Sequence, residues 1–203
     1  MWIVTTEEKI IKAAEEVFIE QGYDGARMQE IADRAEINKA MLHYYFRSKD
    51  MLFEKIFEEK VKVLFPAMGE QMKSHEGFMD KVCFFIEQYY EILTKYPFMP
   101  FFVISTINRK DDKHFIEKLP FGFIKEIFFE SFFSDLQSGK IREVNPFQFA
   151  ISVMGMSVFP FLTRPAMKEL IGINDEQFQM LMQQRIAELK NYVRLILIPT
   201  NHA

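Results

Sequence analysis

The side chains best suited to chemistry lie between residues 27 and 49, and that chemistry is recognition of a nucleic acid. A lysine can donate to the O6 and N7 atoms of guanine, a glutamine can pair with adenine, and an alanine methyl can touch the methyl group of thymine. Lys39, Gln29 and Ala40 supply these three groups. We predict that they read base edges in a major groove.

Other residues of the same stretch are suited to the backbone of the duplex. His43 and Tyr44 can reach a base edge or a phosphate. Arg27, Tyr45 and Lys49 are better placed for phosphates, which position a protein without reading sequence. The predicted DNA-contacting residues are Arg27, Gln29, Lys39, Ala40, His43, Tyr44, Tyr45 and Lys49.

Two short helices joined by a tight turn must hold these side chains. Apolar residues recur at helical spacing on both sides of a short polar break. The break ends at Asn38, a good N-cap because its side chain can accept from an exposed amide of the next turn. A helix is therefore predicted from Lys39 to about Tyr45. The layout, at about 27–46, is that of a helix-turn-helix reader.

Flanking motifs make this pattern specific. They are F-x-x-x-G-Y at 18–23, I-A at 31–32, L-H-Y-Y-F at 42–46 and S-K-D-x-L-F at 48–53. With these motifs in order, the run from Thr5 to Phe53 resembles the DNA-binding domain of the TetR family of transcriptional regulators. The resemblance implies a homodimeric repressor. Its larger helical domain is expected to bind a small molecule, and this binding is expected to release the operator.

Three positions depart from the family pattern. Ala26 and Arg27 stand where Thr or Ser usually caps the second helix. Glu36 replaces the usual turn glycine, and Met41 replaces a usual threonine. Each departure affects one backbone or phosphate contact that the family pattern implies, and the expected fold is unchanged.

The rest of the chain also has helical patterns, so the predicted fold class is all-α. No strand alternation of any length appears. Breaks are expected at 74–77, 96–100, 109–112, Pro120, 139–146, Pro165 and 172–174. We predict an N-terminal three-helix helix-turn-helix DNA-binding domain at 4–48 and a larger helical ligand-binding and dimerisation domain at 49–203.

Two further helices are predicted, one that supports the two helices of the reader and one that follows them. Thr5 and Glu8 form a capping-box pattern for a first helix that ends before Gly22. A long helix is expected from about Lys49 to Pro66 or somewhat beyond. In the family that the sequence resembles, this helix couples the DNA reader to the second domain.

The net charge of −4 sets a limit on DNA affinity. Residues 1–60 hold nine Lys or Arg against thirteen Asp or Glu, so even the predicted reader is acidic overall. Within 27–49 the basic residues are in excess, and they are Arg27, Arg34, Lys39, Arg47 and Lys49. We expect a small basic face and modest non-specific affinity, since the electrostatic contribution grows with the number of phosphates neutralised.

The second region is rich in phenylalanine, often as adjacent pairs. Two neighbours on a helix point in different directions, so one ring can enter a core while the other lines a cavity or an interface. Composition alone favours a Phe-rich core without a cavity. The family resemblance favours a pocket for a small apolar or aromatic effector.

Two segments, 146–162 and 175–198, are candidates for a dimer interface. The first is apolar nearly all round, and the second carries an apolar stripe. Asn145 with Pro146, and Asn174, mark their starts. From the residues alone, packing within one chain and a four-helix dimer interface are equally open. The resemblance favours the homodimer.

The sequence offers no signature of an enzyme, so no catalytic residue, metal ligand or cofactor is predicted. Nucleotide-binding loops, a nucleophile elbow and paired Cys or His at metal spacing are all missing from it. Cys83 is expected to be a buried apolar residue. No signal peptide or membrane span is apparent, and a cytoplasmic location is expected.

The leading hypothesis is a sequence-specific transcriptional regulator, a ligand-released homodimeric repressor on a palindromic double-stranded operator. Two alternatives remain open. One is a carrier of an apolar ligand that has lost DNA recognition, and the other is a helical protein-interaction domain in which Tyr44 and Tyr45 form a contact patch. The effector, the operator and the regulated genes are not encoded in any recognisable motif.

Overall fold

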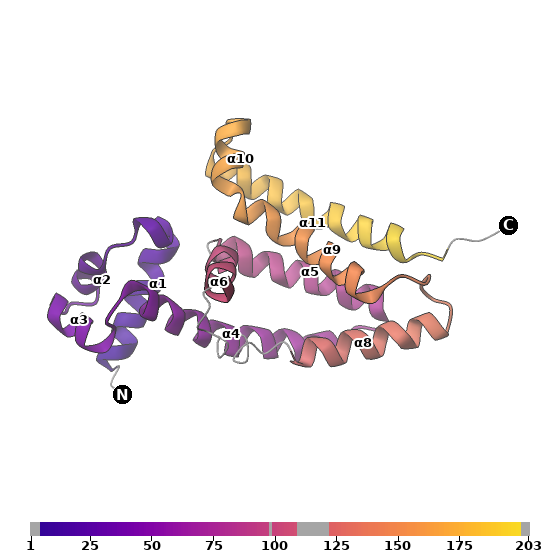
Figure 1. Ribbon diagram of the computed structural model, residues 1–203, viewed down its shortest axis with the longest axis horizontal. Helices are drawn as coiled ribbons and strands as arrows, with labels where there is room; N and C mark the ends of the chain where they lie inside the picture. The colour runs from indigo at the N-terminus through magenta and orange to yellow at the C-terminus, as the bar shows by residue number, and fades with distance from the viewer. Residues whose placement is uncertain (1–4, 98, 109–121, 200–203) are drawn as a thin grey trace.

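The computed structural model describes residues 5–97, 99–108 and 122–199, and every regular element within these ranges is a helix. Three helices form one end of an elongated molecule (Figure 1), namely α1 (Thr6–Gly25), α2 (Met28–Arg34) and α3 (Lys39–Tyr45). From there α4 (Lys49–Lys73) leads into a second group. That group contains α5 (Phe78–Lys95), α6 (Met99–Asn108), α8 (Gly122–Gln137), α9 (Pro146–Leu162), α10 (Arg164–Ile171) and α11 (Asp175–Leu197). The all-α fold class is confirmed.

α1 begins with the capping box that the sequence predicts. The Glu8 amide donates to the Thr5 hydroxyl over 3.2 Å, and the Thr5 amide donates to the Glu8 carboxylate over 2.7 Å. This backbone hydrogen bond lowers the pKa of Glu8. At Gly22 the backbone adopts φ 71° and ψ 176°, so the regular helix is interrupted where its end was predicted, and helical structure resumes as far as Gly25.

α4 extends the core of the first group into the second. The Ser48 hydroxyl accepts from the Met51 amide over 3.2 Å at its start, and the helix passes Pro66 and ends at Lys73. One buried row runs along it, made of Leu52, Phe53, Ile56, Phe57, Val61, Phe65, Met68 and Met72. The Phe53 ring meets that of Phe18 on α1 edge to face, with 4.9 Å between centroids. The division at residues 48 and 49 stays a prediction, and the first turns of α4 pack with α1.

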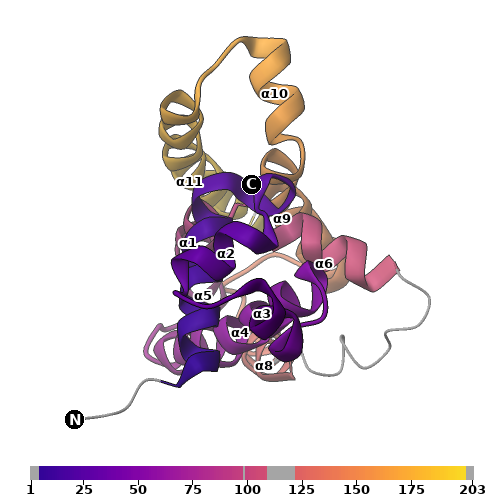
Figure 2. The same cartoon turned by 90° about the vertical axis from the view of Figure 1, so that its left-hand side faces the viewer.

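α5 lies at the centre of the second group, where α4, α8, α9 and α11 all pack against it. Figure 2 shows α10 projecting from this bundle, and its contacts are with α9 and α11. The Asn145 side chain accepts from the amides of Phe147 and Gln148 at the start of α9. The Asn174 side chain forms a capping box with Gln177 at the start of α11.

The helices predicted at 146–162 and 175–198 are thus confirmed as α9 and α11. The breaks predicted at 74–77, 96–100, 139–146 and 172–174 fall at helix ends. Pro165, predicted as a break, lies in the first turn of α10. The breaks predicted at 109–112 and Pro120 lie outside the described residues.

A buried carboxylate fixes the start of α5 against α8. Asp135 on α8 accepts from the Phe78 amide over 2.6 Å. An acidic group is favourable here because the first amides of a helix have no partner within it. Gly77 precedes this amide with φ 81°, and a Cβ at this position would stand 3.0 Å from the Asp135 carboxylate. Glycine meets both the backbone and the steric requirement.

A polar contact also joins the first group of helices to the second. Tyr96, at the end of α5, is buried, and its hydroxyl donates to Glu15 on α1 over 2.8 Å. The other Glu15 oxygen lies 2.6 Å from the Lys60 ammonium on α4. Burial and the hydrogen bond to Glu15 raise the pKa of Tyr96 well above its ordinary value. Three helices therefore meet at one carboxylate.

We predict that Tyr96→Phe lowers the free energy of unfolding by about 1 to 2 kcal/mol, because a hydrogen bond to a charged group is lost at a partly buried site. Chemical denaturation of the full chain measures this change.

Tyr90→Phe on the same helix is the matched control. The Tyr90 hydroxyl is buried and has no hydrogen-bond partner among the described residues. The guanidinium of nearby Arg185 donates to the Met156 carbonyl. Removing this hydroxyl should leave stability unchanged or raise it, since a buried unpaired group is costly. Equal losses in the two variants would contradict the assigned role of Glu15.

Candidate nucleic-acid interface

One fully buried leucine anchors α3. Leu42 has 0% exposure and packs in the same core as Ile31 and Ala32 of α2, which are also inaccessible. The Asn38 side chain accepts from the Met41 amide over 2.8 Å, so the predicted N-cap is confirmed. The helix ends at Tyr45, as the sequence indicates, and buried Phe46 follows it. Burying Leu42 fixes which face of α3 turns outward.

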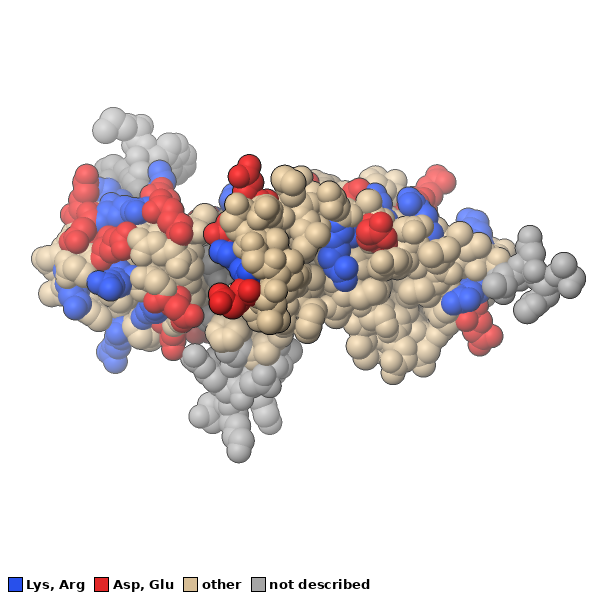
Figure 3. Space-filling model, turned by 90° about the horizontal axis from the view of Figure 1, so that it is seen from above, with Lys and Arg blue, Asp and Glu red and all other residues tan. Residues whose placement is uncertain are grey.

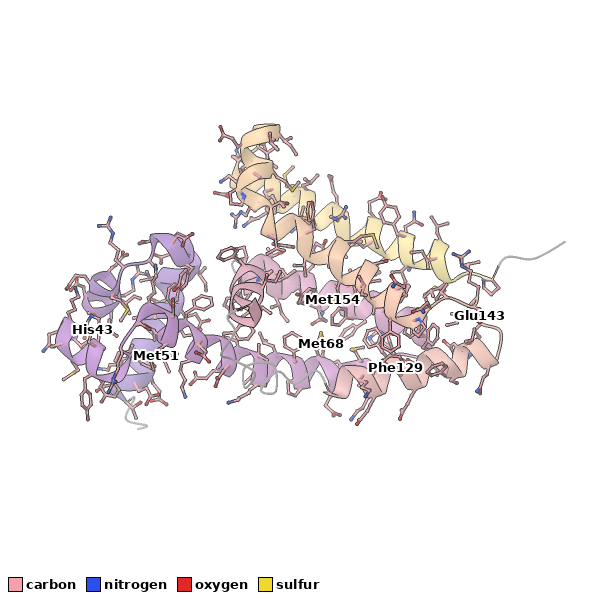
Figure 4. All side chains as sticks on the ribbon, viewed as in Figure 1. His43, Met51, Met68, Phe129, Glu143 and Met154 are labelled. Carbon is pink, nitrogen blue, oxygen red and sulfur yellow. The ribbon has the colours of Figure 1, made fainter. Side chains whose placement is uncertain are left out.

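The outward face of α3 holds most of the predicted DNA-contacting residues. Lys39, Ala40, His43 and Tyr44 are all exposed, and their spacing places them on one side of the helix. Tyr44 is 84% exposed, which is unusual for a large aromatic ring, and it meets the Tyr45 ring edge to face at 5.6 Å. In Figure 4, His43 lies at the end of the molecule away from α9 and α11. The structure therefore brings five of the eight predicted residues together.

Two more of the predicted residues belong to the start of α2. Gln29 is exposed, and its amide donates to Asp33 over 2.8 Å. Reading an adenine would require Gln29 to exchange this surface hydrogen bond for one to the base. Arg27 is exposed at the N-cap position and makes no capping hydrogen bond. The departure from a capping Thr or Ser therefore leaves the first amides of α2 without a side-chain acceptor at this position.

Lys49 has a different environment from the other seven residues. Its ammonium donates to the carbonyl oxygens of Tyr23, Asp24 and Ala26 at 2.6, 3.5 and 3.2 Å. It also lies 4.4 Å from the centroid of the Tyr23 ring, a cation–π distance. These contacts use the three donors of the ammonium to close the end of α1. Contact between Lys49 and DNA stays a prediction, and the described geometry gives this lysine a structural role.

Arg34 is also engaged within the protein. Its guanidinium donates to both carboxylate oxygens of Glu20, at 2.7 and 2.8 Å, and lies 3.5 Å from Glu30. The hydrogen bond to Arg34 lowers the pKa of Glu20. Figure 3 shows Lys and Arg interspersed with Asp and Glu over this end of the molecule. Arg27, Lys39 and Arg47 are also basic and exposed, and they form no ion pair with an acidic group among the described residues.

The turn between α2 and α3 is a Schellman motif with a glutamate in the position that favours glycine. The Ile37 amide donates to the Ala32 carbonyl over 3.0 Å, and the Glu36 amide donates to the Asp33 carbonyl over 3.1 Å. Glu36 has φ 58°, the one positive value among the described residues other than glycine. The family turn is thus formed without its usual glycine.

Comparison with known proteins agrees with this geometry. Residues 10–56, which span α1 to the start of α4, match the model of the bacterial regulatory proteins of the tetR family. This stretch is therefore similar to the DNA-binding domain of TetR-family regulators.

Two curated relatives are similar to part of the chain. The transcriptional repressor NicS of Pseudomonas putida is 42% identical over 53 residues, 26% of this chain and 25% of NicS. The negative regulator of the biofilm operon icaADBC, IcaR of Staphylococcus aureus, is 33% identical over 91 residues, 45% of each chain. The matches thus span between a quarter and just under half of these curated relatives.

Solved structures share the fold over nearly the whole chain. PfmR of Thermus thermophilus has a TM-score of 0.64 at 18% identity, and the alignment covers 99% of this chain and 100% of PfmR. FadR of Bacillus subtilis in complex with stearoyl-CoA has a TM-score of 0.58 at 20% identity, over 89% of this chain and 96% of FadR. At such identities the likeness describes the fold alone.

A cavity in the second group of helices was not located from the sequence. It has a volume of about 140 Å³ and lies between α5, α8 and α9. Its lining residues are Phe78, Val82, Phe85, Lys125, Phe128, Phe129, Phe132, Pro146, Phe149, Ala150, Val153 and Met154. Within each of the three helices, the lining residues follow helical spacing, and this spacing is visible in the sequence. The sequence does not show that these faces of α5, α8 and α9 meet in space.

The phenylalanine pairs behave in two ways around this cavity. Phe132 is buried in its lining, whereas Phe133 is 49% exposed, so this pair divides between two directions. Phe128 and Phe129 both line the cavity, because it covers a wide arc of α8. The side chain of Phe102 lies outside the described residues.

No group of three or more His, Cys, Asp or Glu within residues 5–97, 99–108 and 122–199 is arranged to hold a metal ion. Cys83 is buried as predicted, and burial raises its pKa. Over the same ranges no single helix is long and apolar enough to cross a membrane, although α9 and α10, bent by 64°, pass that test of length and composition as a pair.

We predict that Glu36→Gly raises the free energy of unfolding by about 0.5 to 1 kcal/mol. A left-handed conformation costs an L-residue about 1 to 2 kcal/mol, and glycine avoids this strain. Glycine also has more conformational freedom in the unfolded chain, which offsets part of the gain in stability. Thermal or denaturant unfolding measures the gain. Glu36→Ala keeps the Cβ and removes the same charge, so an equal gain in both variants would assign the effect to charge and contradict the backbone argument.

Proposed function

We propose that this chain is a sequence-specific transcriptional regulator that acts as a ligand-released homodimeric repressor. The observation that carries the proposal is the outward face of α3, fixed by buried Leu42 and capped by Asn38. Two such helices, one from each protomer, enter successive major grooves about 34 to 36 Å apart on an approximately palindromic operator. The names of NicS and IcaR support repression as the mode of regulation.

Each exposed residue of the interface has a role in this proposal. Lys39 donates to a guanine, Ala40 touches a thymine methyl, and Gln29 reads an adenine after leaving Asp33. His43 and Tyr44 reach base edges or phosphates. The phosphate-contacting residues are Arg27, Tyr45 and Arg47, and Lys49 acts on the same surface by holding the end of α1. No catalytic step and no cofactor belongs to this function.

Dimerisation through α9 and α11 is the second part of the proposal. Both helices bury one face against α5 and leave large apolar side chains on the other. On α9 the exposed residues are Phe147, Ile151, Met154 and Phe159, and on α11 they are Met180, Leu181, Tyr192 and Leu195. Exposed apolar surface of this extent is typical of an interaction site. A second copy of the same chain supplies a matching surface under two-fold symmetry.

The cavity between α5, α8 and α9 is the proposed effector site. It is largely apolar, as sites for small organic molecules usually are. One of its walls, Phe85, also belongs to the buried cluster that extends through α4 to the DNA-binding helices. A ligand that displaces Phe85 therefore changes packing that the reader shares. This connection supports a ligand-responsive regulator over a simple carrier.

The proposal predicts different effects for Lys39→Ala and Arg47→Ala on an operator selected from random DNA. Lys39→Ala removes a base contact and weakens specific binding by about 1 to 3 kcal/mol, with little change for unrelated DNA. Arg47→Ala removes one phosphate contact per protomer. It weakens all sequences alike and makes the slope of log affinity against log salt about two units shallower for a dimer. Gel-shift titrations over a range of salt measure both.

Unchanged operator affinity after Lys39→Ala would refute the base-reading role. Failure to enrich any sequence, with only weak binding to DNA, would instead favour the carrier of an apolar ligand.

We further predict that Ile151→Glu on α9 raises the dimer dissociation constant at least tenfold, because a charge is buried in place of an apolar side chain at two symmetric positions. Sedimentation velocity measures the oligomeric state. Val63→Glu on α4 is the matched control, since Val63 is as exposed as Ile151 and lies on a different helix. A dimer that survives Ile151→Glu intact would exclude α9 from the interface.

A further inference from the structure

The shape of the cavity limits the ligands that it can hold. Its volume of about 140 Å³ is close to that of an engineered protein cavity of about 150 Å³ that binds benzene. The site is therefore close in size to a single six-membered ring. An acyl chain of eighteen carbons holds three times as many carbon atoms as benzene, and it would need the helices to move apart.

The walls of the cavity are suited to an aromatic ring. Phe78 meets Phe128 and Phe132 edge to face, with centroids 5.8 and 5.1 Å apart, and lies 5.5 Å from Phe149. Rings in such arrangements present both edges and faces to a space between them. An aromatic guest gains from edge-to-face contacts beyond the burial of its area. Asp135 holds the Phe78 backbone in place, so this wall is set before a ligand arrives.

One charged side chain contributes to the lining. Among the described lining residues, Lys125 alone carries a charge. It lies one turn before Phe128 and Phe129 on α8, and it is exposed to solvent. A lysine in this position keeps its ammonium in water at the rim while its stem covers apolar surface. The site thus pairs an apolar interior with a positive charge at its edge.

We propose that the cavity binds a single-ring aromatic carboxylate, with the ring among the phenylalanines and the carboxylate beside Lys125. This inference rests on the proposed function, because it specifies the chemistry of the effector. The carboxylate stays partly hydrated at the rim, so no charge has to enter the apolar interior. Neutral rings lack the ion pair, and aromatic amines are repelled by the same lysine.

The test compares three ligands that differ in charge and share one ring. They are phenylacetate, phenylacetamide and phenethylamine, titrated into the full chain by isothermal calorimetry. Phenylacetate should bind most tightly. Lys125→Gln should weaken phenylacetate about fivefold, the range of a partly exposed ion pair, and leave phenylacetamide unchanged. Lys125→Glu should reverse the order, so that phenethylamine binds more tightly than phenylacetate.

A second pair of variants tests the location of the ring. Ala150 lines the cavity and is exposed, so Ala150→Phe can fill the mouth without disturbing the core. It should reduce phenylacetate binding at least tenfold. Ala166→Phe, at an exposed position on α10, is the matched control and should leave binding unchanged.

Three results would overturn the inference. They are absence of binding by phenylacetate, an order of ligands that Lys125→Glu does not alter, and tight binding of stearoyl-CoA in place of the single-ring acids. Gel-shift titrations without ligand judge the proposed function separately. Operator binding that persists when phenylacetate fails to bind would reject this ligand class and leave the DNA-binding proposal standing.

Discussion

The buried row along α4 is the constraint on which the rest of the structure depends. Its first residues complete the core of the DNA-binding helices, and its last residues pack within the second group. Because the row is continuous, the two groups of helices share one apolar cluster, so they are packed together and not merely linked by the chain. Glu15 contacts both Tyr96 and Lys60. The apolar contacts stabilise the packing of the two groups, and these directional polar contacts fix their relative orientation.

At the DNA-binding end the protein uses some of its positive charge for its own stability. Arg34 is surrounded by Glu16, Glu20 and Glu30, and Lys49 closes the end of α1 through backbone carbonyls. These contacts orient α2 and α4 relative to α1. They also leave few cations for phosphates, which fits a chain whose net charge is −4. Under the proposed function, selectivity then depends on contacts with bases more than on general attraction to DNA.

Local sequence signals predicted what local forces determine. The capping residues Thr5, Asn38 and Asn174 marked helix starts correctly, because an N-cap acts within one turn of its helix. The TetR-family motifs and the all-α class were also recognised in advance. The roles of Lys49 and Arg34 were not, since they depend on partners far along the chain whose approach no local spacing encodes. The cavity escaped prediction for the same reason: it exists only where faces of three helices converge.

Phe85 belongs both to the wall of the cavity and to the apolar cluster that reaches the DNA-binding helices. A substitution there that reshaped the pocket for a new compound would at the same time alter the packing beneath the reader. Selection for new ligands would therefore act more freely on Phe129, which lines the cavity and belongs neither to the buried cluster nor to the proposed dimer face of α9. Under the proposed function, the part of the pocket that is free to change lies on α8, because α9 also serves the dimer and α5 also packs beneath the DNA-binding helices.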